Sequence, residues 1–225
     1  MIKIYNLSKS YGNAKVLNTI NLQLNSGYIY GFVGENGSGK TTLFKCIAGL
    51  EDFEGRIDSD YEPLKNHLGL LLTEPYFMPK LTAREYIMMM CNARGVSYKD
   101  INKKNIFDLP LDRYASQYST GMKKKLALLA ILLQKNDFFI LDEPFNGVDI
   151  QSNIMISELI KSLKALGKTI LISSHIISSL TDMCDEIFML KDGQINQRFD
   201  KEDFNKLSSE LQNENITDKI NLLGL

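Results

Sequence analysis

The chain has 225 residues, of which 44% are hydrophobic and 24% charged, a composition that fits one large globular α/β domain or two small ones. Its net charge of −1 excludes the basic surface that wholesale nucleic-acid binding needs. The three scattered cysteines form no C-x-x-C pair, and the longest apolar run, 126–133, has eight residues. A disulfide scaffold, a zinc site and a membrane-spanning helix of ~20 residues are therefore excluded.

The beginning of the chain reads as an antiparallel sheet. Ile2 and Ile4, then Ile20, Leu22 and Leu24, alternate with polar residues in the two-residue period of half-buried strands. Turn residues at 11–12 and 25–27 separate these stretches and favour strands that fold back on each other.

A glycine-rich loop lies between an apolar run at 28–33 and another at 43–48. It matches the G-x-x-x-x-G-K-[ST] pattern, and the order of strand, loop and helix is the context in which that pattern indicates a phosphate-binding loop. The loop consists of Gly34, Glu35, Asn36, Gly37, Ser38, Gly39, Lys40, Thr41 and Thr42. We expect residues 36–42 to bind a nucleotide.

The residue types in this loop suit phosphate chemistry. Glycines allow positive φ angles, so backbone N–H groups and the positive end of the next helix can face a phosphate. Lys40 would reach the β- and γ-phosphates, and the Thr41 hydroxyl would bind Mg²⁺. The alternative is a turn that binds nothing. Tyr11, in a turn ahead of the loop, would stack on a base or is simply an edge aromatic.

Residues 75–133 are predicted to form a helical insertion in the α/β core. A buried strand at 67–72 precedes them, and no strand pattern follows until residue 138. Thr82 and Glu85 form a capping box for one helix, and Ser119 or Thr120 caps a second helix that runs to residue 133. The apolar residues Met88 to Cys91 are a candidate docking surface or, equally, part of the core.

Two carboxylates directly follow a continuous apolar run at 138–141, which is typical of a central parallel strand. Ligands of open α/β sheets lie outside the carboxyl ends of the strands, where Asp142 and Glu143 fall. Asp142 would hold Mg²⁺ through water, and Glu143 would orient or deprotonate an attacking water. The alternative is a polar strand end with a turn at Pro144.

The remaining pattern predicts a helix at 154–166, a buried strand at 169–172 and a hairpin of 186–190 with 194–199. A lone histidine is usually structural, but His175 follows the strand at 169–172 and so lies beside the other strand ends. In the tail, 200–225, apolar residues recur at helical intervals, and we expect a terminal helix.

Together these features resemble the ATP-binding subunit of an ATP-binding cassette (ABC) transporter over nearly the whole chain. The discriminating stretch, 117–126, is similar to the ABC signature loop and the start of its helix. Residues 145–149 look like the D-loop, His175 matches the switch histidine, and Tyr11 matches the aromatic that stacks on adenine. The resemblance implies one domain, 1–225: an α/β P-loop NTPase core with an N-terminal antiparallel β subdomain and an α-helical subdomain at roughly 75–133.

The resemblance also implies a mechanism. Two ATP molecules would lie in a homo- or heterodimer, each between the P-loop of one subunit and the signature of the other, where Ser119, the Gly121 N–H and Asp149 contact nucleotide. Lys40, Glu143 and His175 would carry catalysis, with Mg²⁺ as cofactor. The partner would be an integral-membrane subunit, at the inner face of the cell membrane, and no nucleic acid is expected. The Tyr-Ser-x-Gly-Met-Lys signature is similar to drug and antibiotic exporters, so export is favoured.

Three consecutive lysines, Lys123 to Lys125, lie in the first turn of the signature helix, where the helix dipole prefers acids. Lysines at a position that disfavours positive charge indicate an anionic ligand, and a lysine face exposed to solvent is the alternative.

The chain departs from the family pattern at three positions. Thr73 stands where the family usually has a Gln or Glu that contacts Mg²⁺. Its hydroxyl has a shorter reach, so we expect a bridging water or Glu74 to take over. Thr120 and Met122 replace the common Gly and Gln of the signature, and Thr120 crowds a tight backbone approach.

Two other functions fit parts of the pattern. One is a non-transport ABC ATPase that acts on nucleic acid or ribosomes, but such proteins carry two cassettes, coiled coils or basic extensions, and the sequence has none of these. The other is a subunit that holds ATP without hydrolysing it. Glu143 and His175 argue against that reading, and Thr73 argues for it.

Overall fold

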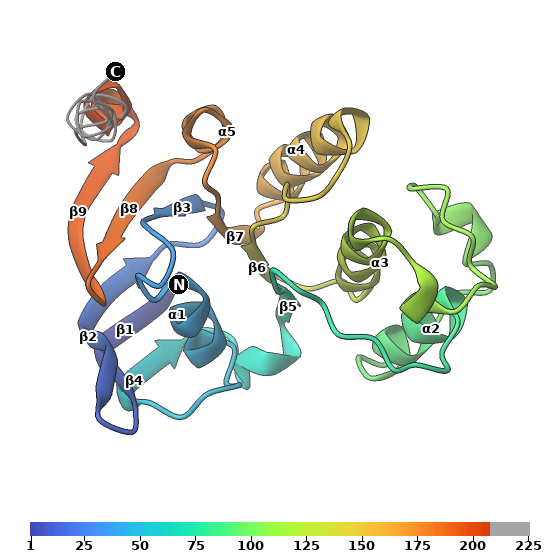
Figure 1. Ribbon diagram of the computed structural model, residues 1–225, viewed down its shortest axis with the longest axis horizontal. Coiled ribbons are helices and arrows are strands. Elements are labelled where there is room, and N and C mark those ends of the chain that lie inside the picture. The colour runs from blue at the N-terminus through green and yellow to red at the C-terminus, as the bar shows by residue number, and fades with distance from the viewer. Residues whose placement is uncertain (208–225) are drawn as a thin grey trace, which may run out of the picture.

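The computed structural model describes residues 1–207, which contain two β-sheets and the helices around them (Figure 1). A three-stranded antiparallel sheet has the order β2-β1-β4, with β1 at Ile2–Tyr11, β2 at Ala14–Leu24 and β4 at Glu54–Ser59. A second sheet has the order β5-β6-β7-β3-β8-β9. Its strands are β3 (Ile29–Val33), β5 (Leu68–Leu71), β6 (Phe138–Asp142), β7 (Thr169–Ser173), β8 (Glu186–Lys191) and β9 (Gln194–Asp200). Its first five strands run parallel, and β9 returns antiparallel beside β8.

The central strands of the second sheet are buried on both faces. On β6, Phe138 and Ile140 belong to the hydrophobic cluster shared with the antiparallel sheet, whereas Phe139 and Leu141 belong to the cluster under the helices. Because successive side chains of a strand point to opposite faces, both faces must be apolar here. This burial explains why the sequence of β6 is a continuous apolar run without alternation.

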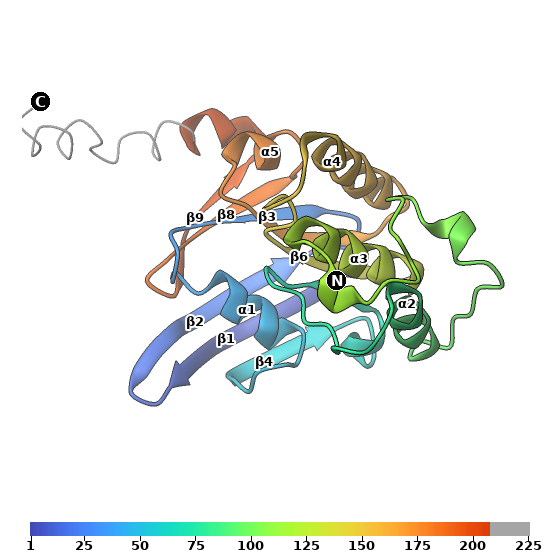
Figure 2. The same ribbon diagram turned by 45° about the vertical axis from the view of Figure 1, so that its right-hand side comes forward.

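The two faces of the parallel sheet carry different layers (Figure 2). Helix α1 (Lys40–Ile47) lies between this sheet and the antiparallel one. Helices α3 (Thr120–Leu133), α4 (Ile150–Ala165) and the short α5 (Ile177–Thr181) pack on the opposite face. The predicted α/β fold with an N-terminal antiparallel part is confirmed.

The chain between β5 and β6 is helical. It contains α2 (Ala83–Asn92) and α3, and no β-strand is assigned to the described residues between β5 and β6. Short 3₁₀ turns lie in it at Asn102–Lys104 and Ala115–Gln117, and another, at Leu64–Asn66, precedes β5. The predicted capping box is present, since Thr82 Oγ1 accepts from the Glu85 N–H at 3.2 Å and Glu85 Oε2 accepts from the Thr82 N–H at 2.8 Å. The limits 75–133 of the helical insertion, and the assignment of residues 1–225 to a single domain, stay predictions.

The two sheets meet where the turn between β8 and β9 reaches β2. The Asn18 N–H donates to the Gly193 carbonyl oxygen at 2.8 Å. Gly193 has a φ of 73°, and a side chain there would overlap the Val16 carbonyl group. This glycine therefore combines a left-handed turn with a close backbone approach, which other residues would not permit.

The tail prediction is only partly covered by the structure. Strand β9 ends at Asp200, a 3₁₀ turn follows at Lys201–Asp203, and residues 204–207 are helical, with Phe204 and Leu207 buried. Residues 208–225 lie outside the described part. Within residues 1–207, no helix has the length and apolar character needed to cross a membrane.

Candidate functional site

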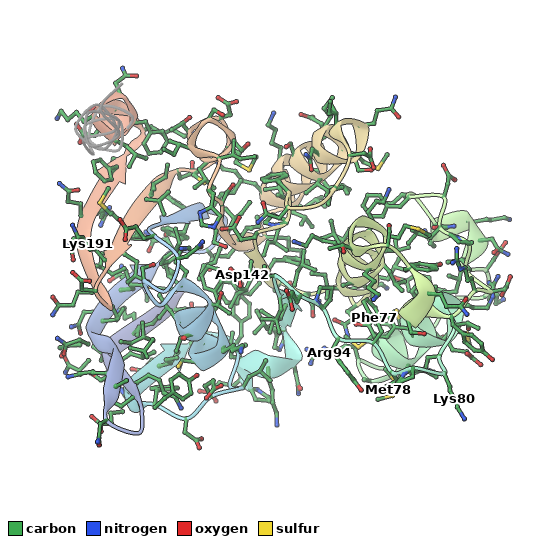
Figure 3. All side chains as sticks on the ribbon, viewed as in Figure 1. Phe77, Met78, Lys80, Arg94, Asp142 and Lys191 are labelled. Atoms are coloured by element: carbon green, nitrogen blue, oxygen red, sulfur yellow. The ribbon has the colours of Figure 1, made fainter. Side chains whose placement is uncertain are left out.

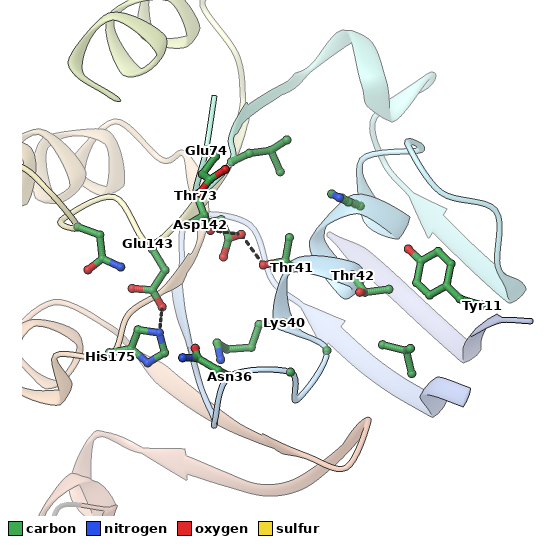
Figure 4. Close-up of a pocket in the computed structure, with 16 residues that line it drawn as sticks. Tyr11, Asn36, Lys40, Thr41, Thr42, Thr73, Glu74, Asp142, Glu143 and His175 are labelled. Atoms are coloured by element: carbon green, nitrogen blue, oxygen red, sulfur yellow. Dashed lines mark hydrogen bonds and ion pairs between the residues drawn. The ribbon is translucent and has the colours of Figure 1, made fainter. Parts of the chain in front are cut away.

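A cavity of about 930 Å³ opens at the carboxyl edge of the parallel sheet, beside the antiparallel sheet (Figure 4). Parallel strands end at the same edge, so the loops after β3, β5, β6 and β7 converge here. Most of the predicted site residues line this cavity: Tyr11, Asn36, Gly37, Gly39, Lys40, Thr41, Thr42, Thr73, Asp142, Glu143 and His175. A volume in this range is typical of pockets for small molecules and cofactors.

The glycine loop leads from β3 into α1 with its backbone facing the cavity. Gly39 has a φ of 108°, and a Cβ there would lie 2.8 Å from Leu17 Cδ2, so this position needs glycine. Helix α1 begins at Lys40, and the N–H groups of a helix's first turn have no partner within the helix. Such a helix start can bind an anion, which fits the phosphate groups of a nucleotide.

The ammonium of Lys40 is held inside the loop. Its Nζ donates to the carbonyl oxygens of Gly34 at 2.7 Å and Glu35 at 3.0 Å. Burial lowers the pKa of Lys40, and the carboxylates of Glu143 and Asp142 act in the opposite direction. The loop therefore keeps a positive charge next to two negative ones.

The Asp142 carboxylate is buried and accepts three hydroxyl groups. Its Oδ2 accepts from Thr41 Oγ1 and Thr73 Oγ1, each at 2.7 Å, and its Oδ1 accepts from Ser173 Oγ at 2.6 Å. This cluster is built of oxygen atoms alone, the ligand type that Mg²⁺ prefers. Thr41, Asp142 and Thr73 thus fit a magnesium ion, which they would hold through these oxygen atoms. Thr73, despite its short side chain, reaches Asp142 directly.

Glu143 has an unusual backbone, with a φ of 52°. This left-handed conformation costs a residue other than glycine roughly 1–2 kcal/mol. Its N–H donates to Ser173 Oγ at 3.0 Å, and its carbonyl oxygen accepts from Lys124 Nζ at 2.5 Å. Its Oε1 lies 3.1 Å from His175 Nε2, the contact drawn in Figure 4. Burial raises the pKa of Glu143, while the neighbouring His175 lowers it.

Tyr11 closes the opposite end of the cavity, on the antiparallel sheet. Its side chain is half exposed, and Lys9 Nζ lies 4.8 Å from the ring centroid. Lys9 is in turn paired with Glu51 at 3.0 Å. Lys9 and Tyr11 both belong to β1, so this cation–π contact within one strand helps to fix the position of the Tyr11 ring.

The signature residues Ser119 and Gly121, and Asp149 of the D-loop, do not line this cavity. Ser119 caps α3 by accepting from the Met122 N–H at 3.3 Å, and Gly121 packs so closely that a Cβ would lie 2.5 Å from the Gly147 carbonyl oxygen. Asp149 caps α4 by accepting from the Ser152 N–H at 2.9 Å. The Ser152 N–H and hydroxyl, with Lys125, hold the pKa of Asp149 well below its usual range.

Ser38, of the glycine loop, does not line the cavity of Figure 4 either. It lies behind the loop, in a smaller cavity against the β8–β9 turn.

The prediction of an anionic ligand for the three lysines is wrong for Lys124. Its side chain is only 1% exposed and points inward to the Glu143 carbonyl oxygen. Lys125 is paired within the chain as well, with Asp149 Oδ2 at 3.2 Å. Successive residues of a helix turn by 100°, so the lysines face different surroundings and do not form one basic face.

Some residues of the site were not predicted from the sequence. Ser173 bridges Asp142 and Glu143, and it lies at the carboxyl end of β7, so the rule that found His175 was able to find it. Val16 also lines the cavity, with no local signal that marks it, and so does Asn146, which lies in the predicted D-loop but was not named as a site residue.

Removal of the Ser173 hydroxyl tests whether this bridge stabilises the site. We expect Ser173→Ala to lower the free energy of unfolding by about 1–3 kcal/mol, because it deprives a buried N–H and a buried carboxylate of a partner. Urea unfolding at pH 7 measures this. Ser116→Ala, which removes an exposed hydroxyl, should stay within about 0.5 kcal/mol of the wild type. Equal stability of both variants would contradict the bridging role.

Comparison with known proteins identifies the family. The ABC transporter family model matches residues 17–146. A lantibiotic transport ATP-binding protein of Streptococcus pyogenes is 35% identical over 206 residues, covering 87% of this chain and 89% of the relative. A bacitracin transport ATP-binding protein of Bacillus licheniformis is 32% identical over 216 residues, covering 87% and 68%.

A solved structure of an ATP-binding subunit of an ABC transporter has a TM-score of 0.80 and 25% identity, and 93% of each chain is covered. A dimeric ATP-binding cassette bound to ADP and Pi has the same fold, with a TM-score of 0.80 at 22% identity, covering 89% of this chain and 99% of that one. The chain belongs to the ABC transporter family, as one of its ATP-binding and ATP-hydrolysing subunits.

Proposed function

We propose that this subunit works as a dimer that binds two ATP molecules at its interface and drives a separate integral-membrane subunit. The observation that carries the proposal is the convergence of Lys40, Asp142, Glu143 and His175 on one cavity at the carboxyl edge of the sheet. The cavity joins a phosphate-binding loop to a buried carboxylate and a histidine, which are the parts that phosphoryl transfer to water requires.

In this proposal different residues of the cavity bind different parts of the nucleotide. Residues 36–42 bind the phosphates through N–H groups and through Lys40, and the ring of Tyr11 stacks on the adenine. Thr41 and Asp142 would hold Mg²⁺, with the Thr73 hydroxyl beside them. When bound, the ion neutralises charge on the β- and γ-phosphates.

The hydrolytic step uses Glu143 as the base. Its carboxylate takes a proton from a water molecule as the water oxygen bonds to the γ-phosphorus. The bond from that phosphorus to the bridging oxygen breaks, which gives ADP and inorganic phosphate. The 3.1 Å contact with His175 supports a role for the histidine in orienting Glu143.

The signature residues are proposed to act on the partner subunit's nucleotide. Ser119, the Gly121 N–H and Asp149 lie outside the cavity of their own subunit, which supports a role across a dimer interface. ATP binding would then join two subunits and hydrolysis would separate them, because the nucleotide contacts both only before cleavage.

A membrane partner has a candidate docking surface at the helical insertion. Four large apolar side chains are exposed there: Tyr76 and Met78 after β5, and Met88 and Met89 on α2. Phe77, between the first two, packs on Tyr86 of α2 with ring centroids 4.6 Å apart, and Figure 3 has Met78 beside α2. Cys91, at the end of the predicted stretch, is 1% exposed and belongs to the core, which was the alternative for it.

The names of the two antibiotic-transport relatives support an antibiotic as the cargo of the assembly, and we propose outward transport. The subunit would then act at the cytoplasmic face of the membrane, with a second ATPase subunit and without nucleic acid.

ATP hydrolysis by the purified protein tests the proposal. The specific rate should rise with protein concentration, because each site needs residues of two subunits. Lys40→Ala and Glu143→Gln should each lower the rate by about 100-fold or more, since one removes a phosphate contact and the other the base. Glu143→Gln should also accumulate an ATP-bound dimer in size-exclusion chromatography. A rate that is independent of concentration, or a failure to dimerise with ATP, would rule out the shared site.

The pH dependence of the rate should report on Glu143. A base must be deprotonated, and burial raises the pKa of Glu143 above its ordinary 4.5, so activity should fall on the acid side at a midpoint above that value. His175→Ala removes the group that lowers this pKa, and the midpoint should move to higher pH. His67→Ala, at the other histidine of the chain, should leave it unchanged. A shift to lower pH in His175→Ala would contradict the assignment.

Charged substitutions in the docking surface should separate partner binding from catalysis. We expect Met88→Asp with Met89→Asp to release the protein from membranes that hold its partner, because a carboxylate opposes burial in an apolar interface. Hydrolysis by the isolated protein should stay within about twofold. Co-purification from membranes measures the effect, with Leu166→Asp as control, since Leu166 is an exposed apolar residue beyond α4. Retention of the double variant would locate docking elsewhere.

A further inference from the structure

Lys124 is a buried ammonium group in the first half of α3, among apolar residues. Its side chain is 1% exposed, and residues 126–131 of the same helix are all buried and apolar. Within residues 1–207, the Glu143 carbonyl oxygen is the one acceptor that hydrogen-bonds to its Nζ. Burial lowers the pKa of Lys124, and the carboxylates of Glu143, Asp142 and Glu74 oppose that effect. A buried charge of this kind is unfavourable for stability unless its contacts repay the lost solvation.

The contact lies at one end of the loop that joins β6 to α4. Lys124 binds the Glu143 carbonyl at the start of this loop, and the next residue, Lys125, binds Asp149 at its end. Between them, Gly121 packs against the Gly147 carbonyl group. The first turns of α3 therefore hold the whole loop from Glu143 to Asp149.

The Glu143 peptide groups are fixed on both sides. Its N–H is bound by Ser173, from β7, and its carbonyl oxygen by Lys124, from α3. The Asn146 N–H also donates to that carbonyl oxygen, at a longer 3.3 Å. Because φ of Glu143 is 52°, rotation of either peptide group would swing the carboxylate away from His175.

We propose that Lys124 is a positioning residue for ATP hydrolysis: its hydrogen bond to the Glu143 carbonyl oxygen fixes the left-handed backbone from which the catalytic carboxylate projects. The inference rests on the proposed role of Glu143 as the base. Since Ser119 caps the N-terminus of α3, Lys124 also joins this carboxylate to the helix that carries the signature residues. Engagement of the signature with a neighbouring nucleotide would be transmitted to Glu143 through one side chain.

A positioning role predicts a change in kcat without a change in the KM for ATP. Lys124 does not line the nucleotide cavity, so its loss should leave the KM for ATP within about twofold. The kcat should fall by about 10- to 100-fold, the size expected for one lost hydrogen bond to a charged group. Lys124→Met keeps the length and apolar body of the side chain and removes only its donors, so the protein should fold with an unchanged thermal midpoint.

The test is a double-mutant cycle with Lys124→Met and Glu143→Gln, measured as single-turnover ATP cleavage and as ATP binding. Lys161→Met, the same change at an exposed lysine of α4, is the matched control. If Lys124 acts through Glu143, Lys124→Met slows the wild type but has no further effect in the Glu143→Gln background. ATP affinity and thermal midpoint stay unchanged in both.

Four outcomes would overturn the inference. An unchanged kcat in Lys124→Met, together with a loss of about 100-fold or more in Glu143→Gln, would overturn it and leave the proposed function intact. The same loss in both backgrounds, or a parallel loss of ATP affinity and thermal midpoint, would show a structural role without a link to the base. If Glu143→Gln itself cleaves ATP at the wild-type rate, the proposed function fails, and the inference fails with it.

Discussion

The acceptance of three hydroxyl groups by one buried carboxylate, Asp142, is the interaction on which the site depends. The donors Thr41, Thr73 and Ser173 are 101, 69 and 31 residues away in sequence. A buried carboxylate is tolerated only when such donors replace its lost water. The glycine loop, the end of β5 and the end of β7 must therefore all be in place around β6. The same contacts that stabilise the charge assemble the cavity.

Positively and negatively charged side chains lie next to each other around the Asp142 carboxylate. Asp142 and Glu143 lie between two buried ammonium groups, Lys40 on the cavity side and Lys124 on the side of α3. The pKa values of both lysines are lowered by burial and raised by the same two carboxylates. Each buried charge is thus compensated by neighbours of opposite sign, and the triphosphate enters a site whose own charges are already balanced.

Much of this site was readable from the sequence because its signals are local. The glycine pattern, the apolar run of β6 and the position of His175 after β7 each depend on a few neighbouring residues and on the rule that parallel strands end together. Glu85 and Thr82 were likewise predictable as a capping box, since three residues of spacing decide it.

The remainder depends on contacts between distant segments. Lys124 turns inward because of how α3 rotates against the loop after β6, and no spacing within α3 records that rotation. Cys91 stayed undecided between a docking surface and the core for the same reason, since one side of α2 faces α3. Ser173 followed the strand-end rule but carries no charge, so nothing in its type drew attention to it.

The junction between the sheets, where Gly193 meets β2, bears on the length of ligand that the cavity can bind. The ring of Tyr11, which we propose stacks on the base, lies on the antiparallel sheet, whereas the phosphate loop follows a strand of the parallel sheet. The backbone contact of Asn18 with Gly193 joins the two sheets beside the phosphate loop, since a Cβ at Gly39 would lie 2.8 Å from Cδ2 of the neighbouring Leu17. In the proposed site, a free base or a lone phosphate would touch only one of the two sheets. A molecule as long as a nucleotide would contact both sheets at once.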